Sequence, residues 1–189
     1  MKNILILVDM QNGFCKTKKT REVVSRIETL LKKQTFDAVI ATRFLNADNS
    51  PFAKMLNWNK MIENNPITKY EKEETKIVKP LKKYIHAVLF KRGCYGLDKD
   101  FSLDTLMETI NDIIGNADKK QIFIAGVDTD CSVLATAISL FENGICPIVL
   151  TKYCASNGGK KSHKAGLTCL KRLIGQKQLI DSETIKFKE

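Results

Sequence analysis

Two small nucleophilic side chains, Cys131 and Ser132, lie in the segment QIFIAGVDTDCSVLATA at positions 121–137. An apolar run from Ile122 to Ala125 is typical of a buried strand. Gly126 and a short polar turn follow it, and a helical pattern begins near Ser132. This order places the nucleophiles at a helix N-terminus, where unpaired backbone N–H groups and the positive end of the helix dipole gather. Such a corner can lower a thiol pKa or hold a developing oxyanion. The alternative is an ordinary strand–turn–helix corner with a capping Asp or Ser.

Two charged side chains follow other strand-like segments. Asp9 comes directly after the apolar run Ile4–Val8, and Lys91 follows the run 86–90. In open parallel sheets ligands bind beyond the carboxyl ends of the strands, so we expect these side chains to meet the nucleophiles there. A carboxylate in a partly dry pocket can take a proton from a nucleophile, and a nearby ammonium keeps that carboxylate ionised. Taken singly, Asp9 also fits a turn or cap residue and Lys91 a surface charge.

The elements that must position these residues alternate between strand-like and helix-like patterns. Repeated strand–helix units predict one domain over residues 1–189, with a parallel sheet covered on both faces. The interval 44–80 contains three prolines and is predicted to be a long excursion from the core. The predicted strands are 4–8, 38–41, 86–90, 122–125, 145–150 and 178–180. The predicted helices are one around 23–31 with Thr20 as a possible N-cap, 103–114 with Ser102 before it, 133–141, and 165–174 with Ser162 as its cap.

Size and composition favour a soluble globular protein. The chain has 189 residues, of which 43% are hydrophobic, enough for a sizeable core. No run approaches the roughly 18 apolar residues that span a membrane. The N-terminal apolar run ends at Asp9 with no small-residue cleavage site after it, so we interpret it as a strand and not a signal peptide. A cytoplasmic location is the default expectation.

Cysteine and histidine spacing gives no sign of a metal site or other cofactor. The six cysteines form no CxxC pair, and the chain has only two histidines, so the usual zinc spacings are absent. The formal net charge of +10 raises the possibility of a nucleic-acid partner. The lysines are nevertheless spread along the chain with no basic segment interleaved with aromatics, which favours a solvated basic surface.

Three of these segments together resemble the isochorismatase-like cysteine hydrolase family over nearly the whole chain. They are ILILVDMQNGF, VLFKRGCYG and GVDTDCSVLATA, the last followed by FENGICPIVLTKYCAS. The resemblance implies a three-layer α/β/α sandwich with a mostly parallel six-stranded sheet, usually in a homo-oligomer such as a dimer or tetramer. It also implies that Asp9 and Lys91 are catalytic. The turn is implied to hold a cis peptide, at Val127–Asp128, and to form an oxyanion hole from backbone N–H groups near Val127, Asp128 and Ser132.

The sequence departs from the family pattern at the nucleophile. The family reads T-D-x-C-V-x-x-T-A, and anchoring it on Thr129 and Asp130 places the nucleophile at Ser132, with Cys131 at the variable position. A shift that made Cys131 the nucleophile would need the turn rebuilt, since neighbouring residues of a helix point about 100° apart. We therefore favour Ser132. A natural variant and a laboratory replacement of Cys are both compatible with the sequence.

A second departure concerns metal. The metal-binding Asp and His residues of the family's nicotinamidases have no counterpart in ATRFLNADNSPF, positions 41–52, which favours the metal-free branch. The leading hypothesis is an amidohydrolase of small amides or related C–N bonds, slowed because Ser132 replaces Cys. One alternative is an isochorismatase-type vinyl-ether hydrolase with Asp9 as the acid, and another is a catalytically silent ligand-binding homologue.

The expected partner is a small-molecule substrate, with no nucleic acid and no membrane. Four residues are expected to line its pocket: Gln11, Phe14, Tyr95 and Cys131. Phe44 and Trp58 are further aromatic side chains that fit a pocket, the core or an oligomer contact equally well.

Overall fold

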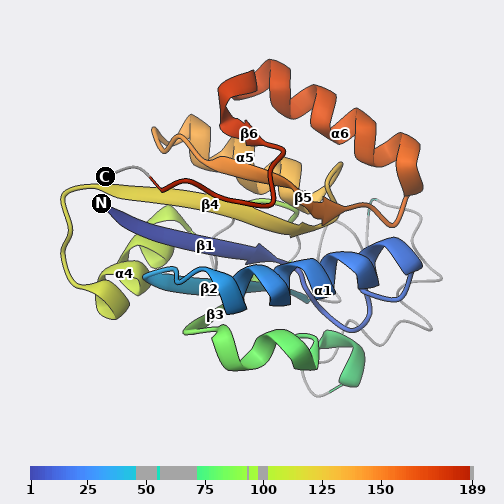
Figure 1. Cartoon of the computed structure of the whole chain (residues 1–189), viewed down its shortest axis with the longest axis horizontal. Helices are drawn as coiled ribbons and strands as arrows, with labels where there is room; N and C mark the ends of the chain where they lie inside the picture. Colours follow the sequence, from blue (N-terminus) through green and yellow to red (C-terminus); the bar gives the residue numbers. More distant parts are fainter. Residues whose placement is uncertain (46–54, 56–71, 93, 98–101, 188–189) are drawn as a thin grey trace.

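A six-stranded parallel sheet forms the centre of the molecule in the computed structural model (Figure 1). The structure describes residues 1–45, 55, 72–92, 94–97 and 102–187. The sheet order is β3-β2-β1-β4-β5-β6, and every neighbouring pair is parallel. The strands are β1 (Lys2–Val8), β2 (Ala38–Leu45), β3 (Ala87–Arg92), β4 (Lys120–Val127), β5 (Ile148–Ala155) and β6 (Leu179–Ile180).

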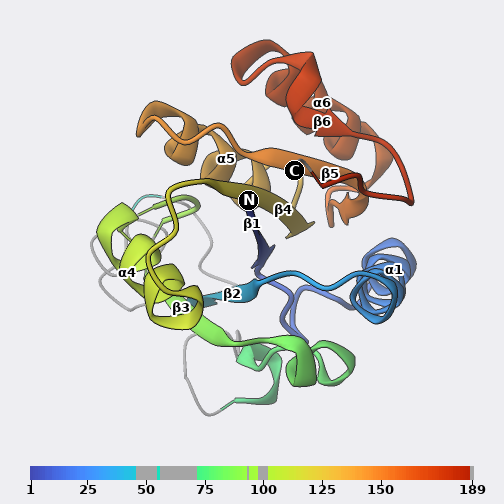
Figure 2. The same ribbon diagram turned by 60° about the vertical axis from the view of Figure 1, so that its left-hand side comes forward.

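Helices cover both faces of this sheet, as Figure 2 shows in the turned view. The α-helices are α1 (Lys18–Lys33), α4 (Leu103–Ile114), α5 (Ser132–Glu142) and α6 (Gly159–Leu173). The 3₁₀ helices are η2 (Glu73–Thr75), η3 (Lys79–Tyr84) and η4 (Gln176–Gln178). One buried cluster joins α1 and η3 to the sheet through residues such as Ile27, Leu81 and Phe123. A second joins α4, α5 and α6 to the opposite face, through Ile110, Val133 and Leu170 among others. The expected three-layer α/β/α architecture is confirmed.

The four central strands, β2, β1, β4 and β5, are buried on both faces, which explains their continuous apolar sequences. All residues of β1 from Asn3 to Val8 are buried, as are those of β4 from Gln121 to Val127. Parallel strands covered by helices on both sides show this continuous pattern in place of alternation. No helix in the described part of the chain is long and apolar enough to cross a membrane.

Two helix starts differ from the sequence prediction. Helix α1 is capped by Thr17 and not by Thr20, because the Thr17 hydroxyl accepts the Thr20 N–H at 3.2 Å while the Thr20 hydroxyl accepts the Thr17 N–H at 3.1 Å. This reciprocal capping box satisfies two donors of the first turn. Helix α6 begins at Gly159, and Ser162 lies inside it. The apolar pattern missed the first turns of α6 because they carry exposed lysines.

The fifth strand is also shifted relative to the prediction. It begins at Ile148, not Ile145, and continues to Ala155. Its pairing with β4 is irregular, since Ile124 pairs with Val149 but Gly126 pairs with Cys154. A bulge of this kind breaks the regular pattern from which a strand boundary is read. Most of the predicted excursion 44–80, including Trp58, lies outside the described residues.

Candidate active site

A buried ion pair joins Asp9 to Lys91 at the carboxyl edge of the sheet. Asp9 follows β1 directly, and Lys91 is the fifth residue of β3. The Lys91 ammonium donates to Asp9 Oδ2 at 2.7 Å, and the two side chains are 0% and 2% exposed respectively. Lys91 also donates to the Tyr95 carbonyl at 3.0 Å. The two residues expected to be catalytic are therefore in direct contact.

Thr42, the fifth residue of the intervening strand β2, also contacts Asp9. The Thr42 hydroxyl donates to Asp9 Oδ1 at 2.6 Å, and the Asp9 backbone N–H donates to the same hydroxyl oxygen at 3.1 Å. Both carboxylate oxygens of Asp9 therefore accept a hydrogen bond from a fixed donor. Sequence reasoning did not include Thr42, although it directly follows the predicted strand 38–41.

The turn after β4 lies beside Asp9 because β4 and β1 are neighbours in the sheet. Val8 pairs with Gly126, so the residues that follow each of them leave the sheet at the same level. Gly126 has a φ of +136°, and a Cβ there would lie 2.2 Å from the Val8 carbonyl oxygen. Only glycine allows this approach. The peptide bond between Val127 and Asp128 is cis, at the position named from the sequence.

The turn presents backbone N–H groups at the start of α5. The Asp128 carbonyl accepts hydrogen bonds from the N–H groups of Cys131 and Val133, at 3.1 and 3.0 Å. Among the described residues, the N–H groups of Asp128 and Ser132 have no hydrogen-bond partner. Unpaired N–H groups at a helix start are suited to hold a negative oxygen.

The two candidate nucleophiles differ in their surroundings. Ser132 is the first residue of α5 and is 7% exposed. Cys131 precedes the helix, and burial raises the pKa of its thiol to about 11, with the Asp130 and Asp128 carboxylates adding to the rise. The corner thus raises this thiol pKa instead of lowering it, which disfavours a Cys131 thiolate.

Asp128 connects the turn after β4 to Asn157, which follows β5, and through Asn157 to Phe14. Its Oδ1 accepts from the Asn157 backbone N–H at 2.7 Å and from Asn157 Nδ2 at 2.9 Å. Asn157 Nδ2 also donates to the Phe14 carbonyl at 3.0 Å. Burial raises the pKa of Asp128 to about 6, against the lowering effect of the Asn157 hydrogen bonds. Asn157 was not predicted, and its place just after β5 was the only signal for it.

The residues expected to line a substrate pocket fall into two groups. Phe14 and Phe44 pack at a ring-centroid distance of 6.2 Å, and Tyr95 packs against the same cluster. The pKa of Tyr95 is raised by burial and then by Cys131 and Asp128, so its hydroxyl lies within electrostatic reach of the turn. Gln11 is fully buried, and its amide bonds to the Phe44 N–H, the Phe44 carbonyl and the Thr75 carbonyl. Through these hydrogen bonds, Gln11 holds the end of β2 in place.

Comparisons with known proteins identify a family and several similar folds. A family model described as the isochorismatase domain matches residues 3–182. The fold is similar to PnC1 from L. infantum, solved in complex with nicotinate, with a TM-score of 0.70, 18% identity and 95% of each chain covered. It is similar to N-carbamoylsarcosine amidase from Thermoplasma acidophilum, with a TM-score of 0.67, 17% identity and coverage of 93% and 94%. It also resembles nicotinamidase/pyrazinamidase PncA from Bacillus subtilis, with a TM-score of 0.68, 19% identity and coverage of 96% and 100%. A comparison with curated protein sequences gave no significant match.

Proposed function

Because the chain belongs to the isochorismatase family of hydrolases, we propose that it hydrolyses a small amide or related C–N bond with Asp9, Lys91 and Ser132. The buried Asp9–Lys91 pair is the observation that carries the proposal. A buried charge pair beside a turn of unpaired N–H groups supplies both a base and an oxyanion site. Lys91 holds Asp9 in place through one oxygen, and Thr42 holds it through the other.

In the proposed reaction, Asp9 accepts the proton of the residue-132 nucleophile as its Oγ or Sγ attacks the amide carbon. The carbonyl oxygen becomes an oxyanion, held by the N–H groups of Asp128 and Ser132. Asp9 then gives the proton to the departing nitrogen, and ammonia or an amine leaves. Water then attacks the resulting ester or thioester while Asp9 accepts one of its protons. The bond to residue 132 breaks, Asp9 returns the proton to the Oγ or Sγ of that residue, and the carboxylic acid is released.

The expected rate of amide hydrolysis depends on the serine at position 132. A hydroxyl is far harder to deprotonate than a thiol, and the described site has a carboxylate and no histidine as the base. We therefore expect Ser132→Cys to release ammonia from small amides at least a hundredfold faster than the unchanged chain. Ammonia release over a panel of small amides, nicotinamide included, measures this.

Two further variants test the assignment of the base and of the nucleophile. Adding Asp9→Asn to the Ser132→Cys chain should abolish the gain, whereas adding Cys131→Ala should leave it intact. Equal turnover by the unchanged chain and Ser132→Cys would refute the role of residue 132. Loss of the gain in the Cys131→Ala background would identify Cys131 as the nucleophile.

The serine also favours a second candidate, hydrolysis of a vinyl ether, because that chemistry needs no thiol. Asp9 would then protonate the vinyl carbon, and water would add to the resulting cation. Pyruvate release from isochorismate at equal rates in the unchanged chain and Ser132→Cys would support this reaction. No pyruvate at high enzyme concentration would exclude it. Saturable binding of a carbonyl compound without turnover in either form would instead identify a silent ligand-binding homologue.

A further inference from the structure

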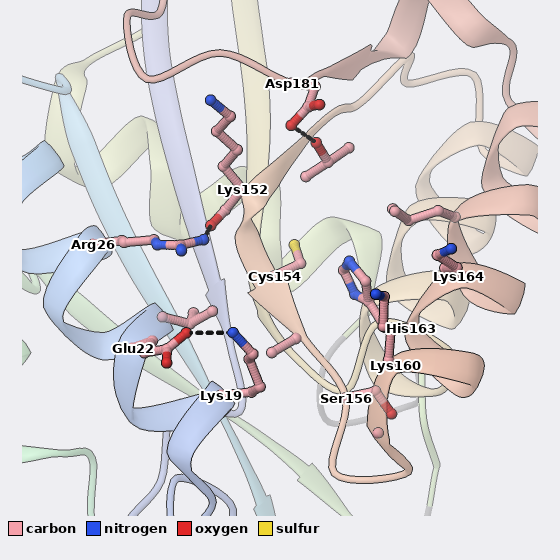
Figure 3. Close-up of a pocket in the computed structure, with 15 residues that line it drawn as sticks. Lys19, Glu22, Arg26, Lys152, Cys154, Ser156, Lys160, His163, Lys164 and Asp181 are labelled. Atoms are coloured by element: carbon pink, nitrogen blue, oxygen red, sulfur yellow. Dashed lines mark hydrogen bonds and ion pairs between the residues drawn. The ribbon is translucent and has the colours of Figure 1, made fainter.

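A cavity of about 470 Å³ lies between α1 and α6, beside β5 (Figure 3). Strand β6 pairs with β5 only at Val149 and Leu150. From Thr151 onward, β5 therefore borders this cavity, and the two helices form its walls. Asp9, Lys91 and Ser132 do not line it. Its volume falls within the range of about 300–1,000 Å³ that is usual for small-molecule sites.

The lining of this cavity is strongly basic. It contains five cationic side chains, namely Lys19, Arg26, Lys152, Lys160 and Lys164, and two carboxylates, Glu22 and Asp181. Both carboxylates already have partners. Glu22 forms an ion pair with Lys19 at 2.8 Å, and Asp181 accepts a hydrogen bond from the Thr151 hydroxyl at 3.0 Å. Lys152 also forms an ion pair, at 3.9 Å, with Glu183 outside the cavity lining. Arg26, Lys160 and Lys164 are the lining cations that form no ion pair among the described residues.

The charge on α6 is arranged unfavourably for the helix itself. Lys160 and Lys164 are one turn apart on the same face, and among the described residues neither forms an ion pair. Like charges at this spacing repel. The first turn of α6 has no acidic residue and no capping side chain, although a helix N-terminus favours negative charge. A bound anion would offset both effects.

We propose that this cavity binds a small molecule through a phosphate or pyrophosphate group. Lysines act as point charges for phosphate, and helix N-termini are common phosphate sites. Lys160 lies at the start of α6 and forms no ion pair among the described residues, whereas Lys19, at the start of α1 on the opposite wall, is paired with Glu22 (Figure 3). The partly buried Leu167 provides apolar surface for the rest of the ligand. The proposal is independent of the proposed hydrolysis.

His163 connects this cavity to the candidate active site and offers a direct readout. It lines the cavity, and its Nδ1 is 2.8 Å from the Thr129 hydroxyl in the turn that precedes Ser132. The only other histidine, His86, bonds through Nδ1 to the Val39 N–H beside β3 and does not line the cavity. The imidazole NMR spectrum of the whole chain thus holds one reporter at the cavity and one internal control.

The experiment is a titration of the whole chain with sodium pyrophosphate at constant ionic strength, followed by histidine imidazole NMR. The His163 signal should shift saturably while the His86 signal stays in place; a His86→Gln variant assigns the two signals. The double change Lys160→Gln with Lys164→Gln should weaken binding at least tenfold. The matched control, Lys161→Gln with Lys171→Gln, removes equal charge from exposed positions of α6 outside the cavity and should change binding less than twofold.

Two results would overturn the proposal. One is the absence of a saturable His163 shift at millimolar pyrophosphate. The other is an equal loss of affinity in the cavity and control variants, which would show that pyrophosphate responds to net charge alone. Circular dichroism of both double variants checks that the fold is retained.

Discussion

Two charged side chains, Asp9 and Lys91, contact each other at the site, and two uncharged ones, Thr42 and Asn157, donate to its carboxylates Asp9 and Asp128. Charged residues directly after apolar runs are uncommon enough to attract attention, and the sheet edge brings them together. Threonine in a strand and asparagine in a loop are ordinary, so their types carried no signal. Their roles depend on distances between residues 33 and 29 positions apart, which only the fold sets.

Asp128 should make stability depend on pH in an unusual direction. Its folded-state pKa of about 6 lies above its ordinary value, so the folded protein holds this proton more tightly than the unfolded chain does. Linkage then requires stability to fall as pH rises from about 4 to about 6. The full penalty above that range corresponds to roughly 3 kcal/mol.

Asp128→Asn removes that penalty, because the amide mimics the protonated acid and its oxygen can still accept from Asn157. We expect the variant to be more stable than the unchanged chain by roughly 1–3 kcal/mol at pH 7, and equally stable near pH 3.5. Urea denaturation of both proteins from pH 3.5 to 8 gives the difference curve, in which the other titrating groups cancel. A variant that is less stable at pH 7 would show that the carboxylate charge stabilises the loops around the site.

At the scale of elements, periodic patterns predicted all six strands but misplaced several ends. Apolar runs identify a strand or helix where it contacts the core, as with Ile4–Val8 and the apolar face of α4. They fail where an element extends past the core, as at the start of α6. They also fail at the β5 bulge, where the backbone leaves the regular ladder.

Gly126 shows how one position between elements can fix the site. Gly126→Ala would place a methyl group 2.2 Å from the Val8 carbonyl oxygen at a φ of +136°. Strain and overpacking together should cost about 3–5 kcal/mol and push β4 away from β1. Gly144→Ala is the matched control, since its φ is +81° and nothing lies within 4 Å of the added Cβ. It should cost only about 1 kcal/mol. Urea midpoints measure both, and equal costs would contradict the close approach.

Across the whole molecule, the spatial arrangement of the charged side chains is the property least predictable from the sequence pattern. The net charge of +10 arises from lysines spread along the chain, and sequence spacing did not show that five cationic side chains meet between α1 and α6. Two of them lie on α1, one on β5 and two on α6, and the crossovers of the sheet bring them together. The same topology hides the charges of Asp9 and Lys91 from solvent, where salt screens them little.

The net charge should make the protein more stable as sodium chloride rises from about 10 to 300 mM. Repulsion among excess positive charges opposes the compact state, and salt screens it. Salt also weakens surface ion pairs such as Lys2–Asp37 and Lys32–Glu28, but exposed pairs contribute little to stability. Screening of the overall repulsion should therefore dominate and raise the thermal midpoint by a few degrees. Scanning calorimetry at constant pH measures it. A midpoint that falls with salt would show that the local pairs outweigh the net charge.

Sodium phosphate at matched ionic strength should raise the thermal midpoint of the unchanged chain further, because the basic cavity binds the anion. This further increase should be lost in the Lys160→Gln, Lys164→Gln variant.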